Sequence, residues 1–144
     1  MSSPNTLQDF HNKALADYGI ADLWPEAVLK EAKAKTENIT KETDILETFP
    51  FVTIDGEDAK DFDDAIFCKF SDTGFHLKVA IADVSFYVKE GSALDLEAAK
   101  RTTSVYMPKK VVPMLPEKLS NELCSLQPNK RRRCLCIEMD FDKD

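Results

Sequence analysis

The sequence has few of the residues that a disulfide framework or a zinc site requires. It contains four cysteines and two histidines in 144 residues. The cysteines are too few and too irregularly spaced for a disulfide-stabilised secreted domain. A zinc site would need a C-x-x-C pair or neighbouring histidines, and His11 and His76 lie far apart in the sequence. Both classes are therefore disfavoured, and Cys134 and Cys136 are expected to pack in a core.

Long apolar runs are also missing. No stretch approaches the length of a membrane span, and the first residues lack the basic and apolar regions of a signal peptide. We therefore expect a cytoplasmic protein that makes no contact with a membrane. A chain of 144 residues suits one domain. Such a domain can bury roughly two thirds of the surface that its unfolded chain exposes.

Negative charge, in contrast, is abundant and concentrated. Residues 55–64, DGEDAKDFDD, hold six carboxylates directly after the apolar run 51–54. Asp61, Asp63 and Asp64 are close enough in sequence to repel one another, and such groups are tolerated mainly when a cation neutralises them. Oxygen ligands favour a hard divalent cation, with Mg²⁺ or Mn²⁺ ahead of Ca²⁺.

The spacing of these carboxylates argues against a calcium-binding EF-hand loop. Counted from Asp55, Lys60 stands where that loop requires glycine, and counted from Asp61, Ile66 stands there. A strand that ends at Asp55, a six-residue excursion and a returning strand would instead bring Asp55 close to residues 61–64. Such an arrangement could support one or two Mg²⁺ ions, with water and phosphate oxygens completing the coordination.

The charge is divided unevenly along the chain. The net charge is −7, but residues 101–136 carry eight basic against two acidic side chains. An acidic cluster followed by a basic segment suits a metal site that acts on a polyanion, because basic groups such as those at 130–133 can hold a phosphate backbone. The alternative is that both segments are solvated faces with no binding role.

Two helices are expected near the N-terminus. Thr6 and Asp9 match a capping box, and Gly19 is a suitable stop. The apolar face of this first helix would consist of Leu7, Phe10, Ala14 and Tyr18. A second helix begins near Pro25 and runs to about Lys35.

The remaining pattern predicts an α+β fold, with a mixed, mostly antiparallel sheet and flanking helices. We divide the chain into a helical connector and linker at 1–48 and a sheet-containing domain at 49–144. The expected strands are 51–54, 65–70, 75–83 and 134–141, and the expected helices are 92–101 and 117–123. The polar stretch 36–48 has no clear periodicity, which is typical of a linker.

Four segments carry a family resemblance. They are TIDGEDAKDFDDAI (Thr53–Ile66), VAIADVSFYV (Val79–Val88), TSVYMP (Thr103–Pro108) and PMLPEKLSNELCSLQP (Pro113–Pro128). In this order and spacing they resemble the opening of the catalytic domain of the ribonuclease II/ribonuclease R (RNB) family. The segment Tyr18–Ala32 is similar to the connector that precedes this domain in the ribonuclease R branch.

The resemblance implies a processive hydrolase that removes 5′-monophosphates from the 3′ end of single-stranded RNA with Mg²⁺, which Mn²⁺ could replace. Asp55 and Asp64 match direct metal ligands, and Asp61 matches a residue that supports the metal site. Asp63 matches the aspartate on which the chemistry depends most, so Asp61 and Asp63 are the expected catalytic residues. Tyr106 matches a tyrosine that stacks on a base near the RNA 3′ end, a contact that tolerates any sequence.

Other positions are assigned more modest roles. The remaining polar residues of the acidic motif are expected to shape the loop: Glu57, Asp58 and Lys60. We interpret Asp83 as a buried polar anchor rather than a remote support for the site. By resemblance, Phe86 stands where many relatives have histidine and Thr102 where glycine is common.

Members of this family continue the catalytic domain further and flank it with cold-shock and S1 domains. We therefore expect these residues to be a truncated part of such an enzyme, one that binds Mg²⁺ weakly and degrades RNA poorly alone. Two alternatives stay open. One is a catalytically silent RNA-binding or interaction module, and the other is a different metal-dependent phosphoesterase acting on DNA or nucleotides.

Overall fold

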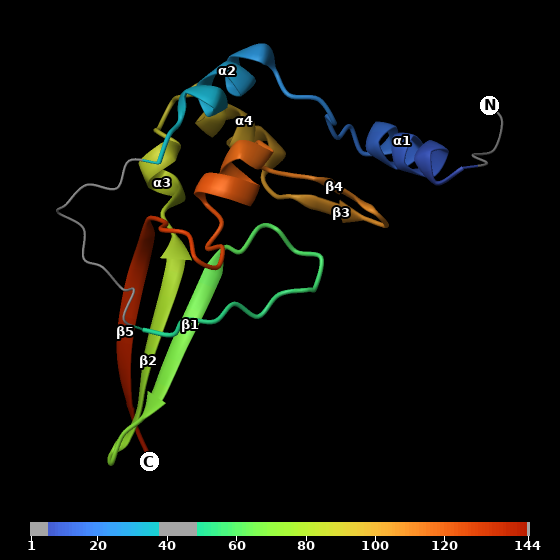
Figure 1. Ribbon diagram of the computed structural model, residues 1–144. Coiled ribbons are helices and arrows are strands. Elements are labelled where there is room, and N and C mark those ends of the chain that lie inside the picture. Colours follow the sequence, from blue (N-terminus) through green and yellow to red (C-terminus); the bar gives the residue numbers. More distant parts are fainter. Residues whose placement is uncertain (1–5, 38–48, 144) are drawn as a thin grey trace.

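The chain folds into an antiparallel sheet with helices gathered at one end of it (Figure 1). The structure, a computed structural model, describes residues 6–37 and 49–143. The sheet has the order β1-β2-β5, and its strands are β1 (Asp64–Phe70), β2 (Gly74–Ala82) and β5 (Cys134–Asp142). Both pairings are antiparallel, so the predicted α+β class is confirmed.

A tight turn at residues 71–73 joins β1 to β2. The Ser71 hydroxyl accepts a hydrogen bond from the Gly74 N–H at 3.1 Å, and the Gly74 carbonyl accepts one from the Ser71 N–H at 2.9 Å. A side chain at Gly74 would meet the Phe141 carbonyl oxygen at 1.7 Å, so the close approach of β5 requires glycine here. The register that follows pairs Asp64 with Ile81, which fixes where β1 begins.

One face of the sheet is apolar and open. Directly opposed residues of an antiparallel pair lie on the same face, and on this face β1 and β2 contribute Phe70, Cys68 and Ile66 beside Phe75, Leu77, Val79 and Ile81. The strand β5 adds Leu135, Ile137, Met139 and Phe141. Leu135 is 61% exposed and Ile137 54%, so the described residues leave much of this face uncovered.

The buried core lies at the helical end of the molecule. It brings together α2 (Glu26–Ala34), α3 (Val84–Tyr87), α4 (Ala93–Arg101) and a short π-helix (Leu119–Leu123). The core side chains are Val28, Ala32, Ala82, Tyr87, Leu94, Leu115, Leu119, Leu123 and Cys124. The predicted cap of α4 is confirmed, since the Ser92 hydroxyl accepts the Asp95 N–H. A carboxylate of α2, Glu31, accepts the Leu94 N–H at 3.0 Å and ties the two helices together.

The first helix, α1 (Leu7–Asp17), begins at the predicted capping box, but its predicted apolar face is wrong. Phe10 is 56% exposed and Tyr18 82%, whereas His11 and Leu15 are buried. The helix extends away from the core (Figure 1). The amphipathic pattern of the helix therefore does not predict which side chains are buried. After the helix ends, the Ile20 N–H bonds to the carbonyl of the buried Leu15 at 2.8 Å.

The predicted strand at 51–54 is also wrong. Only Val52 pairs, through an isolated antiparallel bridge to Ile66 with hydrogen bonds of 2.9 and 2.8 Å. Phe51 and Phe49 turn their rings onto Phe67 instead, with centroids 6.2 and 5.3 Å away. Within the apolar run, Phe51 therefore packs against β1 through its ring, whereas Val52 and Ile54 are exposed. The linker predicted at 36–48 lies outside the described residues from position 38 onward.

The cysteines of β5 also differ from expectation, because Cys134 and Cys136 are half-buried instead of packed in the core. In the part of the chain that the structure describes, no helix is long and apolar enough to cross a membrane.

A two-stranded hairpin, β3 (Val105–Met107) with β4 (Lys110–Val112), projects beside the helices. The segment after α1 lies against it, since the Lys110 ammonium bonds to the Asp22 carboxylate at 2.6 Å. The connector therefore docks on the sheet-containing domain near the hairpin.

Candidate metal and RNA site

The acidic motif forms a loop that leads into β1. Asp64 is the first residue of that strand, and the Ala59 N–H closes a turn onto the Gly56 carbonyl at 3.0 Å. Asp55, Asp63 and Asp64 are exposed, and Asp61 is half-buried. Four predicted metal-binding carboxylates thus stand on one loop and one strand end, accessible to a cation and to solvent.

These carboxylates act on one another electrostatically. Although the Asp63 side chain is open to solvent, the surrounding protein displaces part of its hydration. This desolvation, followed by repulsion from Asp61, Asp64 and Asp55, raises the pKa of the Asp63 carboxyl above its usual value. The repulsion on Asp63 is largest from Asp61 and smallest from Asp55. Convergence is incomplete, however, because among the described residues no three His, Cys, Asp or Glu side chains stand close enough together to hold a metal ion.

The donor set fits a hard cation in its chemistry. Carboxylate oxygens are the ligands that Mg²⁺ and Mn²⁺ prefer, and Mg²⁺ commonly takes one or two carboxylates while keeping several waters. Mutual repulsion around Asp63 is also the condition that a bound cation relieves. The four aspartates are therefore suitable as part of a coordination sphere, with the other positions left to water and substrate oxygens.

The backbone of the loop is fixed by two neighbouring segments. The Leu126 N–H donates to the Phe62 carbonyl at 2.9 Å, and the Ala82 N–H donates to the Asp63 carbonyl at 2.9 Å. A third contact comes from the buried Ser125, whose hydroxyl meets the loop on both sides of Asp61. Ser125 lies within the motif PMLPEKLSNELCSLQP, but no pattern in the sequence predicts its contact with the loop.

Tyr106 reaches the same loop from the hairpin. Its hydroxyl donates a hydrogen bond to the Asp61 carboxylate at 2.9 Å, although 45 residues separate them in sequence. This bond, with some burial and the charges of Asp61 and Asp63, raises the pKa of the Tyr106 phenol. The side chain is still 66% exposed. The structure therefore places an accessible aromatic ring next to the carboxylates, and the bond to Asp61 is a contact that the sequence did not predict.

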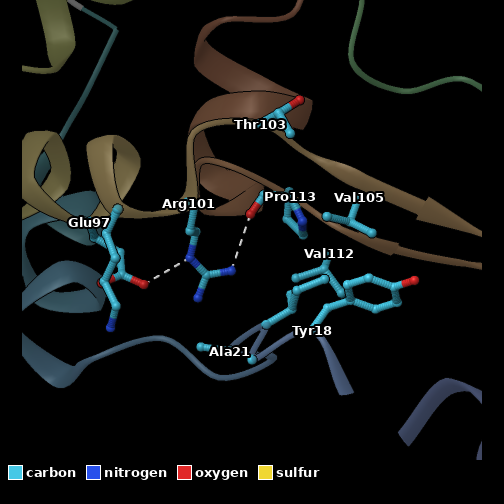
Figure 2. Close-up of a pocket in the computed structure, with 11 residues that line it drawn as sticks. Tyr18, Ala21, Glu97, Arg101, Thr103, Val105, Val112 and Pro113 are labelled. Carbon is cyan, nitrogen blue, oxygen red and sulfur yellow. Dashed lines mark hydrogen bonds and ion pairs between the residues drawn. The ribbon is translucent and has the colours of Figure 1, made fainter. Parts of the chain in front are cut away.

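The base of the hairpin is held by Arg101, at the end of α4. Its guanidinium lies 3.6 Å from the Trp24 ring centroid and donates to the Glu97 carboxylate at 2.8 Å and to the Leu23 carbonyl at 2.9 Å. A further bond of 3.3 Å reaches the Pro113 carbonyl just after β4. Figure 2 shows the bonds of Arg101 to Glu97 and Pro113. Arg101 lines a pocket of about 250 Å³ between the segment after α1 and the hairpin.

Part of the basic segment is used inside the fold. Arg132 donates to the carbonyls of Glu122 and Ser125 at 2.7 and 3.0 Å, and Arg133 lies 3.8 Å from the centroid of the Phe86 ring. Both arginines are therefore engaged in contacts within the protein and are not solvated side chains available to a phosphate. Asp83 accepts the Phe86 N–H at 3.1 Å and caps α3, so it is a polar anchor, but it is half-buried and not buried as predicted.

Comparisons with known proteins agree on one family. The family model described as the RNB domain matches residues 43–144. The chain is 50% identical over 133 residues to ribonuclease R of Acidithiobacillus ferrooxidans, a match that covers 90% of this chain and 30% of that protein.

Solved structures give the same result. RNase R of Mycoplasma genitalium in complex with ribose-methylated single-stranded RNA matches with a TM-score of 0.88 and 38% identity, covering 94% of this chain and 22% of that one. Its complex with double-stranded RNA gives a TM-score of 0.89, also at 38% identity, covering 94% of this chain and 25% of that one. The chain thus spans less than a third of the length of these relatives.

Proposed function

Because the chain belongs to the RNB domain family, we propose that it is one part of a Mg²⁺-dependent hydrolase that removes nucleoside 5′-monophosphates from the 3′ end of RNA. The observation that carries this proposal is the grouping at the acidic loop. Asp61, Asp63 and Asp64 lie just before and at the start of β1, on a backbone held by Ser125, Leu126 and Ala82, and Tyr106 is hydrogen-bonded to Asp61. Carboxylates beside an accessible aromatic ring suit a site that holds a metal ion and a nucleotide together.

The roles of the site residues follow from their positions. Asp55 and Asp64 would bind Mg²⁺ directly, with Asp61 supporting the metal site and Asp63 orienting the attacking water. Bound Mg²⁺ supplies Lewis-acid polarisation of the phosphate and lowers the pKa of a water molecule. Tyr106 stacks on a base near the 3′ end through its open ring face, while its hydroxyl keeps Asp61 in place.

The partners and boundaries belong to the same proposal. The substrate is the 3′ end of single-stranded RNA, in line with the RNA-bound relatives. Residues 1–48 serve as the connector and 49–144 as the first portion of the catalytic domain, joined in the full-length enzyme to cold-shock and S1 domains. The cytoplasmic location expected from the sequence stays a prediction.

A second candidate, a catalytically silent RNA-binding module, is favoured by one observation. The described carboxylates do not by themselves provide three converging donors, so the 144 residues alone would bind Mg²⁺ weakly. In that case the chain holds RNA through Tyr106 and turns it over poorly or not at all.

Nuclease assays separate these candidates. RNA and DNA oligonucleotides of the same sequence, labelled at the 5′ end, are incubated with Mg²⁺ and with a ribonuclease R-length protein that contains this chain, wild type or Asp63→Asn. We expect stepwise shortening of RNA but not DNA, release of 5′-monophosphates, and a loss of at least about a hundredfold in rate for Asp63→Asn.

The chain alone is assayed in parallel, with Asp72→Asn as the control, because Asp72 is an exposed aspartate of the β1–β2 turn. Cleavage of RNA and DNA alike would favour a general phosphoesterase. An Asp63→Asn variant that keeps RNA degradation within severalfold of wild type would remove the assigned role of Asp63.

A further inference from the structure

Ser125 is a buried hydroxyl that contacts the acidic loop from a distant part of the chain. Its side chain is fully enclosed, with a relative exposure of 0%. The hydroxyl donates to the Lys60 carbonyl at 2.7 Å and accepts the Phe62 N–H at 3.1 Å. Both donor and acceptor capacity are therefore used on the two peptide groups that flank Asp61.

These two bonds continue a row of contacts that fixes the loop. Leu126 bonds to the Phe62 carbonyl and Ala82 to the Asp63 carbonyl, each at 2.9 Å. The peptide groups from Lys60 to Asp63 are thus tied to the protein at four points. Because the backbone is held, the fold sets the course of the chain from Lys60 to Asp63, from which the side chains of Asp61 and Asp63 branch.

Ser125 is itself held in place by its neighbours. Its N–H bonds to the Glu122 carbonyl at 3.2 Å, and its own carbonyl accepts from Arg132 at 3.0 Å. The adjacent Cys124 is 2% exposed and belongs to the core. Because the segment that carries the hydroxyl is packed in the core, the hydroxyl can restrict the motion of the loop, whose residues are mostly exposed.

We propose that Ser125 is a positioning residue for the divalent cation, one that fixes Asp61 and Asp63 at the spacing the cation requires. This inference rests on the proposed function, which assigns the cation to these aspartates. Removing the hydroxyl leaves the Lys60 carbonyl and the Phe62 N–H without their partner, so the loop is freed and must be ordered again when the cation binds.

The test compares Ser125→Ala and Ser125→Cys with Ser92→Ala. Ser92 also accepts one backbone N–H, that of Asp95 at the start of α4 and not of a residue in the acidic loop, so it controls for a general loss of stability. Mn²⁺ affinity is measured by electron paramagnetic resonance of the full 144-residue chain. Hydrogen exchange of the Phe62 amide is measured without metal.

We expect Ser125→Ala to weaken Mn²⁺ binding about tenfold and to accelerate exchange at Phe62, while Ser92→Ala changes neither. Ser125→Cys replaces the hydroxyl with a slightly larger and weaker hydrogen-bonding group and should fall between wild type and Ser125→Ala. It serves as the test if Ser125→Ala does not fold.

Wild-type Mn²⁺ affinity in the folded Ser125 variants would overturn the proposal. If wild type itself binds no Mn²⁺, the assignment of the cation to these aspartates fails for the isolated chain, whereas the nuclease assay of the longer protein decides the proposed function. Faster exchange at Phe62 in Ser125→Ala would then still support the loop-holding role of Ser125, and unchanged exchange would refute it.

Discussion

Replacing Arg101 by alanine is expected to destabilise the chain more than any surface substitution. The side chains of Arg101 and Glu97 are each only 8% exposed, and they bond at 2.8 Å. Alanine would leave the Glu97 carboxylate buried without its partner. It would also release the carbonyls of Leu23 and Pro113 and remove the cation that lies on the Trp24 ring.

The magnitude follows from these contacts. Removing one partner of a buried ion pair costs about 3–5 kcal/mol. The lost carbonyl contacts and the ring contact add about 1 kcal/mol each at most, while water entering the adjacent pocket of about 250 Å³ reduces the total. We therefore expect a loss of about 4 kcal/mol in the free energy of unfolding for Arg101→Ala. Arg101→Lys keeps the charge but not the planar fork, and should lose about 2 kcal/mol.

Urea denaturation followed by circular dichroism measures this loss. The single tryptophan, Trp24, lies under Arg101, and its fluorescence reports whether the connector separates first. Lys100→Ala is the matched control, since Lys100 is exposed and should change stability by less than about 0.5 kcal/mol. Adding Glu97→Gln to Arg101→Ala should recover part of the loss, because it removes the unpaired charge. A cost below about 1 kcal/mol for Arg101→Ala would refute the reasoning.

Three further predictions concern other parts of the fold. Thr102 has φ 63° and ψ −38°, a backbone conformation unfavourable for a β-branched residue, so Thr102→Gly should stabilise the chain by about 1 kcal/mol in thermal unfolding. Burial raises the pKa of the Cys124 thiol to about 12, from about 8.5 in an unfolded chain. The stability that this pKa shift contributes is fully present below the unfolded-state pKa and is lost as the pH rises toward the folded-state pKa. Cys124→Ala should therefore flatten the decline of stability above pH ~9. An equally steep decline in the variant would contradict the raised pKa of Cys124. The open apolar face of the sheet should make the chain bind a hydrophobic dye and associate with rising concentration, both reduced by Ile137→Lys; sedimentation that is independent of concentration would argue against an uncovered face.

The sequence predicts correctly those helices and turns whose ends carry a capping or turn residue. The turn at 71–73 and the capped helix after Ser92 are both found, because each depends on residues within a few positions of one another. The apolar run at 51–54 and the apolar stripe of α1 are misread for one reason. Each pattern shows that apolar side chains are present. Which of them are buried depends on residues elsewhere in the chain that pack against them.

The candidate site divides in the same way. The acidic loop is visible in the sequence because its six carboxylates lie within ten residues. The contacts that shape the loop come from residues that are distant in the sequence. Tyr106 meets Asp61 across 45 residues and Ser125 meets Lys60 across 65. No periodicity or composition signals such contacts, because they arise only when the hairpin and the π-helix segment pack around the loop.

The central claim is that the carboxylates around Asp63 bind a divalent cation. Titration of the chain with Mn²⁺, followed by electron paramagnetic resonance, tests it most directly, with Asp63→Asn compared against Asp72→Asn. We expect weak but saturable binding that Asp63→Asn reduces by about tenfold or more and Asp72→Asn leaves unchanged. Equal Mn²⁺ affinity in wild type and Asp63→Asn would contradict it.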